Sequence, residues 1–226
     1  MDTVTYNNIR ASLENLITRY NNTLRQENPA NISEETVRTW LNEFLSIFGW
    51  NVQDTSQVLQ EQFLRGVYYQ RLREIHSTHR KPDYTLLCGA NIKTFLDAKS
   101  LEVNIFTNSD AAFQIRSYGW SAQCPCAFVS NFEQFVIYDT RFIPRNEQDA
   151  NMGTIKLSVD EYLDNLDLLI DHLWRDNICQ NHLAEIYELT AIEGRSRVDS
   201  AFMTELSLFR RSLAENIFAN NPNIIN

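Results

Sequence analysis

The 226-residue chain is poor in glycine, proline and cysteine, with 6, 5 and 4 residues respectively. So little glycine and proline excludes a collagen-like or linker-type chain, and four cysteines do not make a disulfide scaffold in a chain of this length. No apolar run approaches the roughly 20 residues of a membrane-spanning helix, and the N-terminus does not resemble a secretory signal. We therefore expect a globular cytoplasmic protein without a membrane partner.

Positive charge is also scarce, because 20 Lys and Arg stand against 29 Asp and Glu, a formal net charge of −9. An acidic chain argues against nucleic-acid binding. The excess is local, however, since residues 159–193 carry nine acidic residues and one Arg. The first 158 residues are almost balanced, with 15 basic and 17 acidic residues. They contain a basic stretch that we expect to contact DNA phosphates: Arg65, Arg71, Arg73, Arg80 and Lys81.

Apolar spacing and turn residues predict an α/β fold. Helices are expected over 3–24, from the N-cap Ser33 to Gly49, and over 55–77 and 109–122. Strands are expected over 83–88, 92–98, 127–130 and 135–138. This order predicts a mixed central sheet flanked by helices. From Ser158, which forms a capping box with Glu161, we expect an all-helical C-terminal extension that includes helices over 179–191 and 199–219.

Two acidic residues and a lysine come together at one end of the predicted hairpin. Asp83 opens its first strand, while Asp97 and Lys99 stand at the end of the second. Side chains two positions apart on a strand project from the same face, so Asp97 and Lys99 should lie together, with Asp83 close by. Neighbouring carboxylates repel unless a cation separates them, and oxygen ligands suit a hard divalent ion. We therefore predict a Mg²⁺ site, in which Mn²⁺ can substitute, beside an ammonium group.

The same residues carry a resemblance to a known family. Pro82-Asp83 and, fourteen residues on, Asp97-Ala98-Lys99 match the PD-(D/E)-x-K nuclease signature. The stretch from Gln114 to Tyr118 is similar to the Q-x-x-x-Y motif that follows the catalytic lysine in type I and type IIG restriction enzymes. Upstream, a helix with acidic residues ends in Phe48-Gly49-Trp50, which resembles the first helix of those nuclease domains. Over about residues 33–140 the chain thus resembles their N-terminal endonuclease domain.

The resemblance implies a fold of the restriction-endonuclease type and Mg²⁺-dependent hydrolysis of double-stranded DNA. It assigns metal binding to Asp83, Asp97 and the carbonyl of Ala98, and orientation or deprotonation of water to Lys99. Gln114 and Tyr118 would support the site or contact the DNA backbone. Glu35 is the expected acidic residue of the upstream helix, although Glu34 competes with it for that role.

The resemblance also suggests a division into an endonuclease domain, 1–157, and a helical connector, 158–226. The connector would lead to a methyltransferase domain of a longer type IIG-like enzyme, and S-adenosylmethionine would belong to that domain. Cleavage of both strands would require two copies, hence a possible transient dimer. Two alternatives remain: an inert module that kept the fold for DNA binding or scaffolding, or a nuclease of another DNA-processing or defence system.

Overall fold

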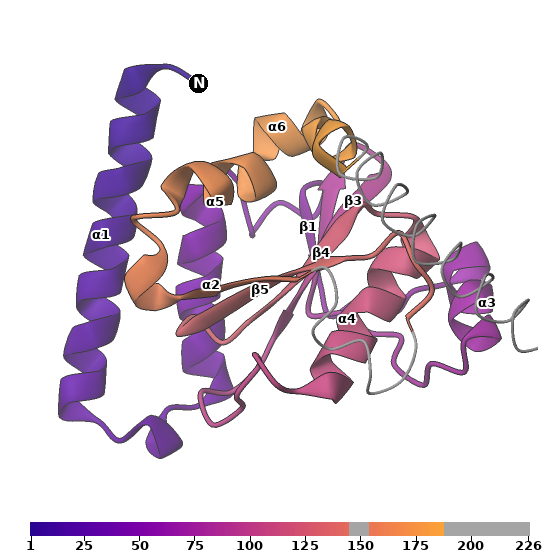
Figure 1. The fold of residues 1–226 in the computed structure, drawn as a ribbon, viewed down its shortest axis with the longest axis horizontal. Helices are drawn as coiled ribbons and strands as arrows, with labels where there is room; N and C mark the ends of the chain where they lie inside the picture. The colour runs from indigo at the N-terminus through magenta and orange to yellow at the C-terminus, as the bar shows by residue number, and fades with distance from the viewer. Residues whose placement is uncertain (145–153, 188–226) are drawn as a thin grey trace, which may run out of the picture. The chain divides into compact units, whose positions relative to one another are not determined.

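The computed structural model describes residues 1–144 and 154–187 (Figure 1). The chain divides into two compact units, Met1–Leu183 and Ala184–Asn226, and the fold below is that of the first. Its centre is a sheet of six strands among the described residues, arranged in chain order. These are β1 (Val58–Gln60), β2 (Tyr84–Cys88), β3 (Asn91–Ala98), β4 (Cys126–Ser130), β5 (Gln134–Asp139) and β6 (Thr154–Ser158).

The sheet is mixed because one pair of neighbouring strands is parallel. β3 and β4 run in the same direction, with Asp97 opposite Val129, and all other neighbouring pairs are antiparallel. A parallel pair needs a crossover connection. Helix α4 (Ser109–Ala122) provides it and packs on β3 and β4. The crossover places α4 beside the end of β3, where the predicted site residues lie.

Helices cover both faces of the sheet (Figure 1). The helices are α1 (Thr3–Gln26), α2 (Glu34–Ile47), α3 (Gly66–Glu74), α4, α5 (Leu166–Leu173) and α6 (Arg175–Cys179), with 3-10 turns η1 (Pro29–Asn31) and η3 (Val159–Glu161). On the α2 face an aromatic core forms, in which Phe44 contacts Phe132, Phe135 and Tyr162. On the opposite face, apolar side chains of α3 and α4 pack against β3, β4 and β5. Both faces of the sheet are therefore buried.

The mixed sheet with flanking helices confirms the predicted fold class and is consistent with a restriction-endonuclease-like fold. The predicted caps are also present: the Ser33 hydroxyl accepts from the N–H of Thr36, and Ser158 and Glu161 form the capping box. The helix predicted over 55–77 is wrong in its first half. Glu61 has a φ of +52°, which a helix does not accommodate, and only Gly66–Glu74 is helical.

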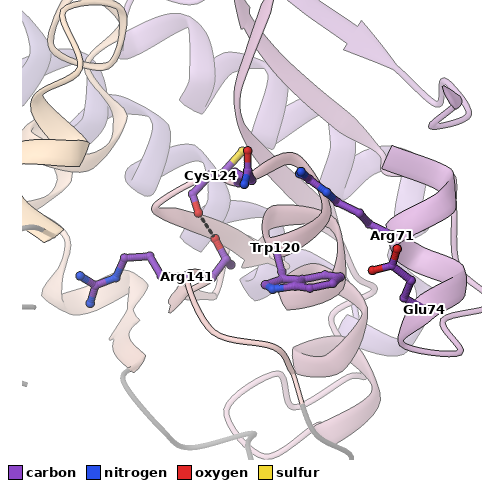
Figure 2. A pocket seen from close by; sticks show the side chains of 7 residues that line it. Arg71, Glu74, Trp120, Cys124 and Arg141 are labelled. Atoms are coloured by element: carbon purple, nitrogen blue, oxygen red, sulfur yellow. Dashed lines mark hydrogen bonds between the residues drawn. The ribbon is translucent and has the colours of Figure 1, made fainter. Parts of the chain in front are cut away.

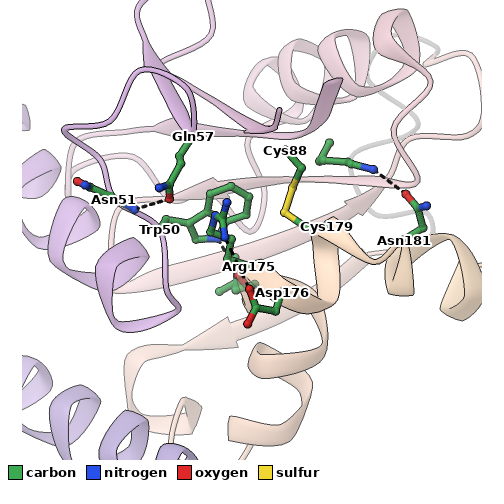
Figure 3. The surroundings of a disulfide bond; sticks show 10 residues. Trp50, Asn51, Gln57, Cys88, Arg175, Asp176, Cys179 and Asn181 are labelled. Carbon is green, nitrogen blue, oxygen red and sulfur yellow. Dashed lines mark hydrogen bonds and ion pairs between the residues drawn. A yellow bond between two sulfur atoms is a disulfide. The ribbon is translucent and has the colours of Figure 1, made fainter. Parts of the chain in front are cut away.

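A disulfide joins Cys88 at the end of β2 to Cys179 at the end of α6, with 5.5 Å between their Cα atoms (Figure 3). Sequence patterns alone did not predict this bond. Nearby bonds join the same parts of the chain. The indole N–H of Trp50 donates to the carbonyl of Leu173 at 2.8 Å, and the Lys93 ammonium donates to Asn181 at 2.6 Å. The helices after β6 are thus attached to the sheet covalently and by hydrogen bonds.

The first unit continues through α5 and α6 to Leu183, and the division after residue 157 stays a prediction. The expected helix over 179–191 is described only to residue 187, and the one over 199–219 lies outside the described residues. The connector role of 158–226 therefore stays a prediction. Within the described ranges, none of the helices is both long and apolar enough to cross a bilayer.

Candidate active site

Asp83 lies immediately before β2, and its carboxylate is held on two sides. Oδ2 accepts the backbone N–H of Ala98 at 2.7 Å, and Oδ1 accepts the guanidinium of Arg38 at 2.6 Å. The hairpin register pairs Tyr84 with Leu96, so Asp83 lies beside the end of β3. The strand ends thus bring Asp83 to Asp97 and Ala98, as the sequence predicted.

Asp97 is 1% exposed, which is unusual for a carboxylate. Its Oδ2 lies 2.5 Å from the ammonium of Lys99, with which it forms an ion pair. Burial raises the pKa of Asp97 to about 7; Lys99 lowers it, and the neighbouring carboxylate of Asp83 adds to the increase. Asp97 and Lys99 therefore lie together as an ion pair, as strand geometry predicts.

Helix α4 adds two polar side chains to this pair. Gln114 accepts from the ammonium of Lys99 at 3.0 Å and donates to Oδ1 of Asp97 at 3.3 Å. The same amide nitrogen lies 3.2 Å from the hydroxyl of Tyr118, one helical turn further on. The motif residues Gln114 and Tyr118 are thus connected to Asp97 and Lys99 in one hydrogen-bonded network.

Arg38 of α2 is part of the site although the sequence did not single it out. Its guanidinium contacts three carboxylates: Asp83 at 2.6 Å, Glu34 at 3.1 Å and Glu61 at 3.2 Å. Glu34 therefore reaches Asp83 through Arg38, whereas Glu35 is exposed and has no such link among the described residues. The spacing of Glu34 and Arg38, one helical turn apart, is the sequence feature that could have indicated this ion pair. A role for Glu35 in the site stays a prediction.

The donor atoms fit a hard divalent cation. Two carboxylates lie at adjacent strand ends, and the buried one, Asp97, pairs with the ammonium of Lys99. Oxygen ligands of this kind suit Mg²⁺, which keeps several waters. No group of three His, Cys, Asp or Glu that could hold a metal occurs in the described ranges. A metal here would consequently complete its shell with the Ala98 carbonyl, water or a phosphate.

Arg71 lines a cavity of about 420 Å³ between α3, the end of α4 and the segment after β5. Figure 2 shows Arg71 and Glu74 on α3 and Trp120 on α4 around this cavity. The Arg71 guanidinium donates to the carbonyl of Ser121 at 3.0 Å. Arg71, a member of the basic stretch, therefore already donates a hydrogen bond within the fold.

The other basic residues remain at the surface. Arg65, Arg73, Arg80 and Lys81 are all exposed. Lys81 pairs with Glu61 at 3.1 Å, and Glu61 also binds Arg38 of the candidate site. The backbone N–H of Glu61 donates to the carbonyl of Asp83 at 2.9 Å. Part of the basic stretch is thus adjacent to the paired aspartates.

Comparison with known proteins finds a relative among restriction enzymes. The chain is 29% identical over 219 residues to the type II restriction enzyme and methyltransferase RM.Eco57I of Escherichia coli. The match covers 92% of this chain but 21% of that protein, so the chain spans about a fifth of the length of this relative. No family model and no solved structure matches. The chain is therefore related in sequence to part of a restriction-modification enzyme.

Proposed function

We propose that this chain is the metal-dependent endonuclease domain of a type IIG-like restriction-modification enzyme with the PD-(D/E)-x-K motif. One observation carries the proposal: the residues of two separate sequence motifs, Asp97 with Lys99 and Gln114 with Tyr118, lie in one hydrogen-bonded network beside Asp83. An Asp–Lys ion pair at the solvated surface would leave its carboxylate exposed. Burying a carboxylate, as at Asp97, is costly. The similarity to a restriction enzyme and methyltransferase supports the same class.

In this proposal Asp83, Asp97 and the Ala98 carbonyl would hold the cation. Bound Mg²⁺ supplies Lewis-acid stabilisation of the charge that develops on the phosphate. The ammonium of Lys99 orients the attacking water by hydrogen bonding, and Gln114 fixes the position of that ammonium through its bond of 3.0 Å. The N–H of Ala98 fixes one oxygen of Asp83, which leaves its orientation set before DNA binds.

The wider setting is also part of the proposal. Double-stranded DNA is the partner, and the whole protein is cytoplasmic. S-adenosylmethionine and sequence recognition belong to a covalently linked methyltransferase part. A double-strand break requires a transient pair of these domains, because each would cut one strand.

The test is nicking of plasmid DNA by the purified chain with Mg²⁺ or Mn²⁺. Asp83→Ala should abolish metal-dependent nicking. A matched control is Asp139→Ala, because Asp139 also pairs with an arginine, Arg141, at 2.6 Å and is similarly buried, 14% against 15% exposed for Asp83. Circular dichroism and thermal melting verify that both variants fold. Nicking by Asp83→Ala at the parent rate would contradict the assignment, and DNA binding without any nicking by the parent would favour the inert module.

A further inference from the structure

An aromatic and a basic side chain meet beside the candidate active site. Phe63 and Val67 are two of the few large apolar residues that stay exposed in the described ranges, at 50% and 52%. The guanidinium of Arg80 lies over the Phe63 ring, 5.1 Å from its centroid, and over the ring of Tyr69 at 5.4 Å. A half-exposed phenylalanine beside a candidate site leaves part of its ring available for contact with a ligand.

Backbone hydrogen bonds attach the segment that carries Phe63 to the residues that lead into Asp83. Leu64 N–H donates to the carbonyl of Arg80 at 2.8 Å, and Glu61 N–H donates to that of Asp83 at 2.9 Å. Phe63 therefore lies on a segment that runs alongside the residues leading into Asp83. A DNA strand that reached Asp83 would pass close to this ring.

The contact between Arg80 and Phe63 limits what the ring can bind. A side chain inserted between two base pairs needs both ring faces, but here the guanidinium covers one of them. One open face suits stacking on a single base. The Arg80 N–H groups have no protein acceptor within the described part of the chain, so they can donate to a phosphate while the rings hold the guanidinium plane in place.

We propose that Phe63, Tyr69 and Arg80 form a stacking platform for an unpaired nucleotide next to the cleaved bond. The base stacks on Phe63 and its phosphate binds Arg80. This inference rests on the proposed nuclease function and adds to it a preference for frayed or cut DNA ends over intact duplex. Each stacked base contributes enough that removing the ring should weaken binding about 5- to 150-fold.

The test compares binding of a blunt duplex with that of the same duplex carrying a short single-stranded overhang. The protein is the full chain with Asp83→Asn, in EDTA, so that no DNA is cut. The overhang should bind more tightly than the blunt end, and Phe63→Ala should remove that difference by weakening overhang binding alone. Phe63→Trp should preserve it. Arg80→Gln should lower the salt slope for the overhang by about 0.7, which Phe63→Ala should leave unchanged.

Phe142→Ala is the matched control, because Phe142 is 58% exposed and also lies under a guanidinium, that of Arg141 at 5.5 Å. It should leave the overhang preference intact. Equal binding of both DNAs by the parent, or equal weakening of both by Phe63→Ala, would overturn the platform. Cleavage of plasmid by the unmodified chain is measured separately. The overhang preference can thus be absent while cleavage persists, and it can be present while cleavage is absent. The two proposals are therefore tested separately.

Discussion

The ammonium group of Lys99 donates a hydrogen bond of 3.0 Å to the side-chain oxygen of Gln114. The nitrogen of the same amide faces Oδ1 of Asp97 at 3.3 Å, so one side chain orients the lysine and the buried carboxylate together. This arrangement explains why a glutamine on the crossover helix accompanies the Asp-x-Lys pair. It also predicts that substitutions of Gln114 and of Tyr118 will affect cleavage to different extents.

We predict that Gln114→Ala slows cleavage about 10- to 100-fold, because a hydrogen bond to a charged group contributes about 1.5–3 kcal/mol. Tyr118→Phe should have a smaller effect, since it leaves the bonds of Gln114 to Lys99 and Asp97 in place and keeps the packed ring. Single-turnover cleavage rates measure both. Parent-like cleavage by Gln114→Ala would show that the amide does not orient the site.

We predict that the exposed arginines contact phosphates and that Arg71 does not. Arg65→Gln and Arg73→Gln should each lower the salt slope of duplex binding by about 0.9, the value for one lost phosphate contact. Arg71→Gln should leave the slope unchanged, because its guanidinium is bonded to the carbonyl of Ser121. Fluorescence titrations over a range of salt concentrations give the slopes. Equal slopes for all three variants and the parent would remove this surface as a DNA contact.

We predict that the bond between Cys88 and Cys179 stabilises the fold. Replacing both with Ser should lower the free energy of unfolding by about 2–4 kcal/mol, because the cross-link limits the freedom of the unfolded chain. Denaturant titration measures the loss, and reducing agent should have the same effect on the parent. The buried thiols of Cys124 and Cys126 provide the internal standard. Titration of four free thiols in the unreduced, denatured protein would contradict the prediction.

We predict that His172 makes the fold sensitive to acid. Burial lowers the pKa of His172 below 6.5; the carbonyl of Leu168 and the carboxylate of Asp171 oppose this, while His182 adds to it. As the pH falls below about 6.5, the unfolded chain takes up a proton that the folded one resists, so stability decreases until the folded pKa is passed. The loss is about 1.4 kcal/mol for each pH unit between the two pKa values.

The measurement is the change in unfolding free energy between neutral and mildly acidic pH. His172→Gln should make this change smaller, whatever its effect on stability at neutral pH. His182→Gln is the comparison, because the His182 side chain is 35% exposed and pairs with Asp171. A parent-like decrease in His172→Gln would assign the acid sensitivity to other groups.

Local signals predicted the elements that position the site. The Gly-containing turn between Asp83 and Asp97 predicted the hairpin, and period-2 alternation predicted that Asp97 and Lys99 lie on the same face. The helical spacing of Gln114 and Tyr118 placed both on one face of α4. Each of these inferences depends on neighbours within a few residues, which is the range over which sequence patterns are informative.

Features that depend on distant parts of the chain were missed. β1 has three residues and β6 pairs only with β5, so both strands are defined by their partners more than by their own composition. The contact of Arg38 with Asp83 joins residues 45 positions apart, and the bond of Cys88 to Cys179 joins residues 91 apart. No local spacing predicts such pairs, because the packing of the whole sheet brings them together.

The parallel pairing of β3 with β4 has a consequence for how the site forms. Asp83, Asp97, Lys99, Gln114 and Tyr118 all lie between the start of the hairpin and the end of the crossover helix. One continuous stretch of the chain, through its hairpin and crossover helix, therefore brings these five groups together. Arg38 is the member that must come from elsewhere, and its arrival neutralises Asp83 only when α2 has docked on the sheet. α2 is thus the element whose packing on the sheet balances the charge of Asp83.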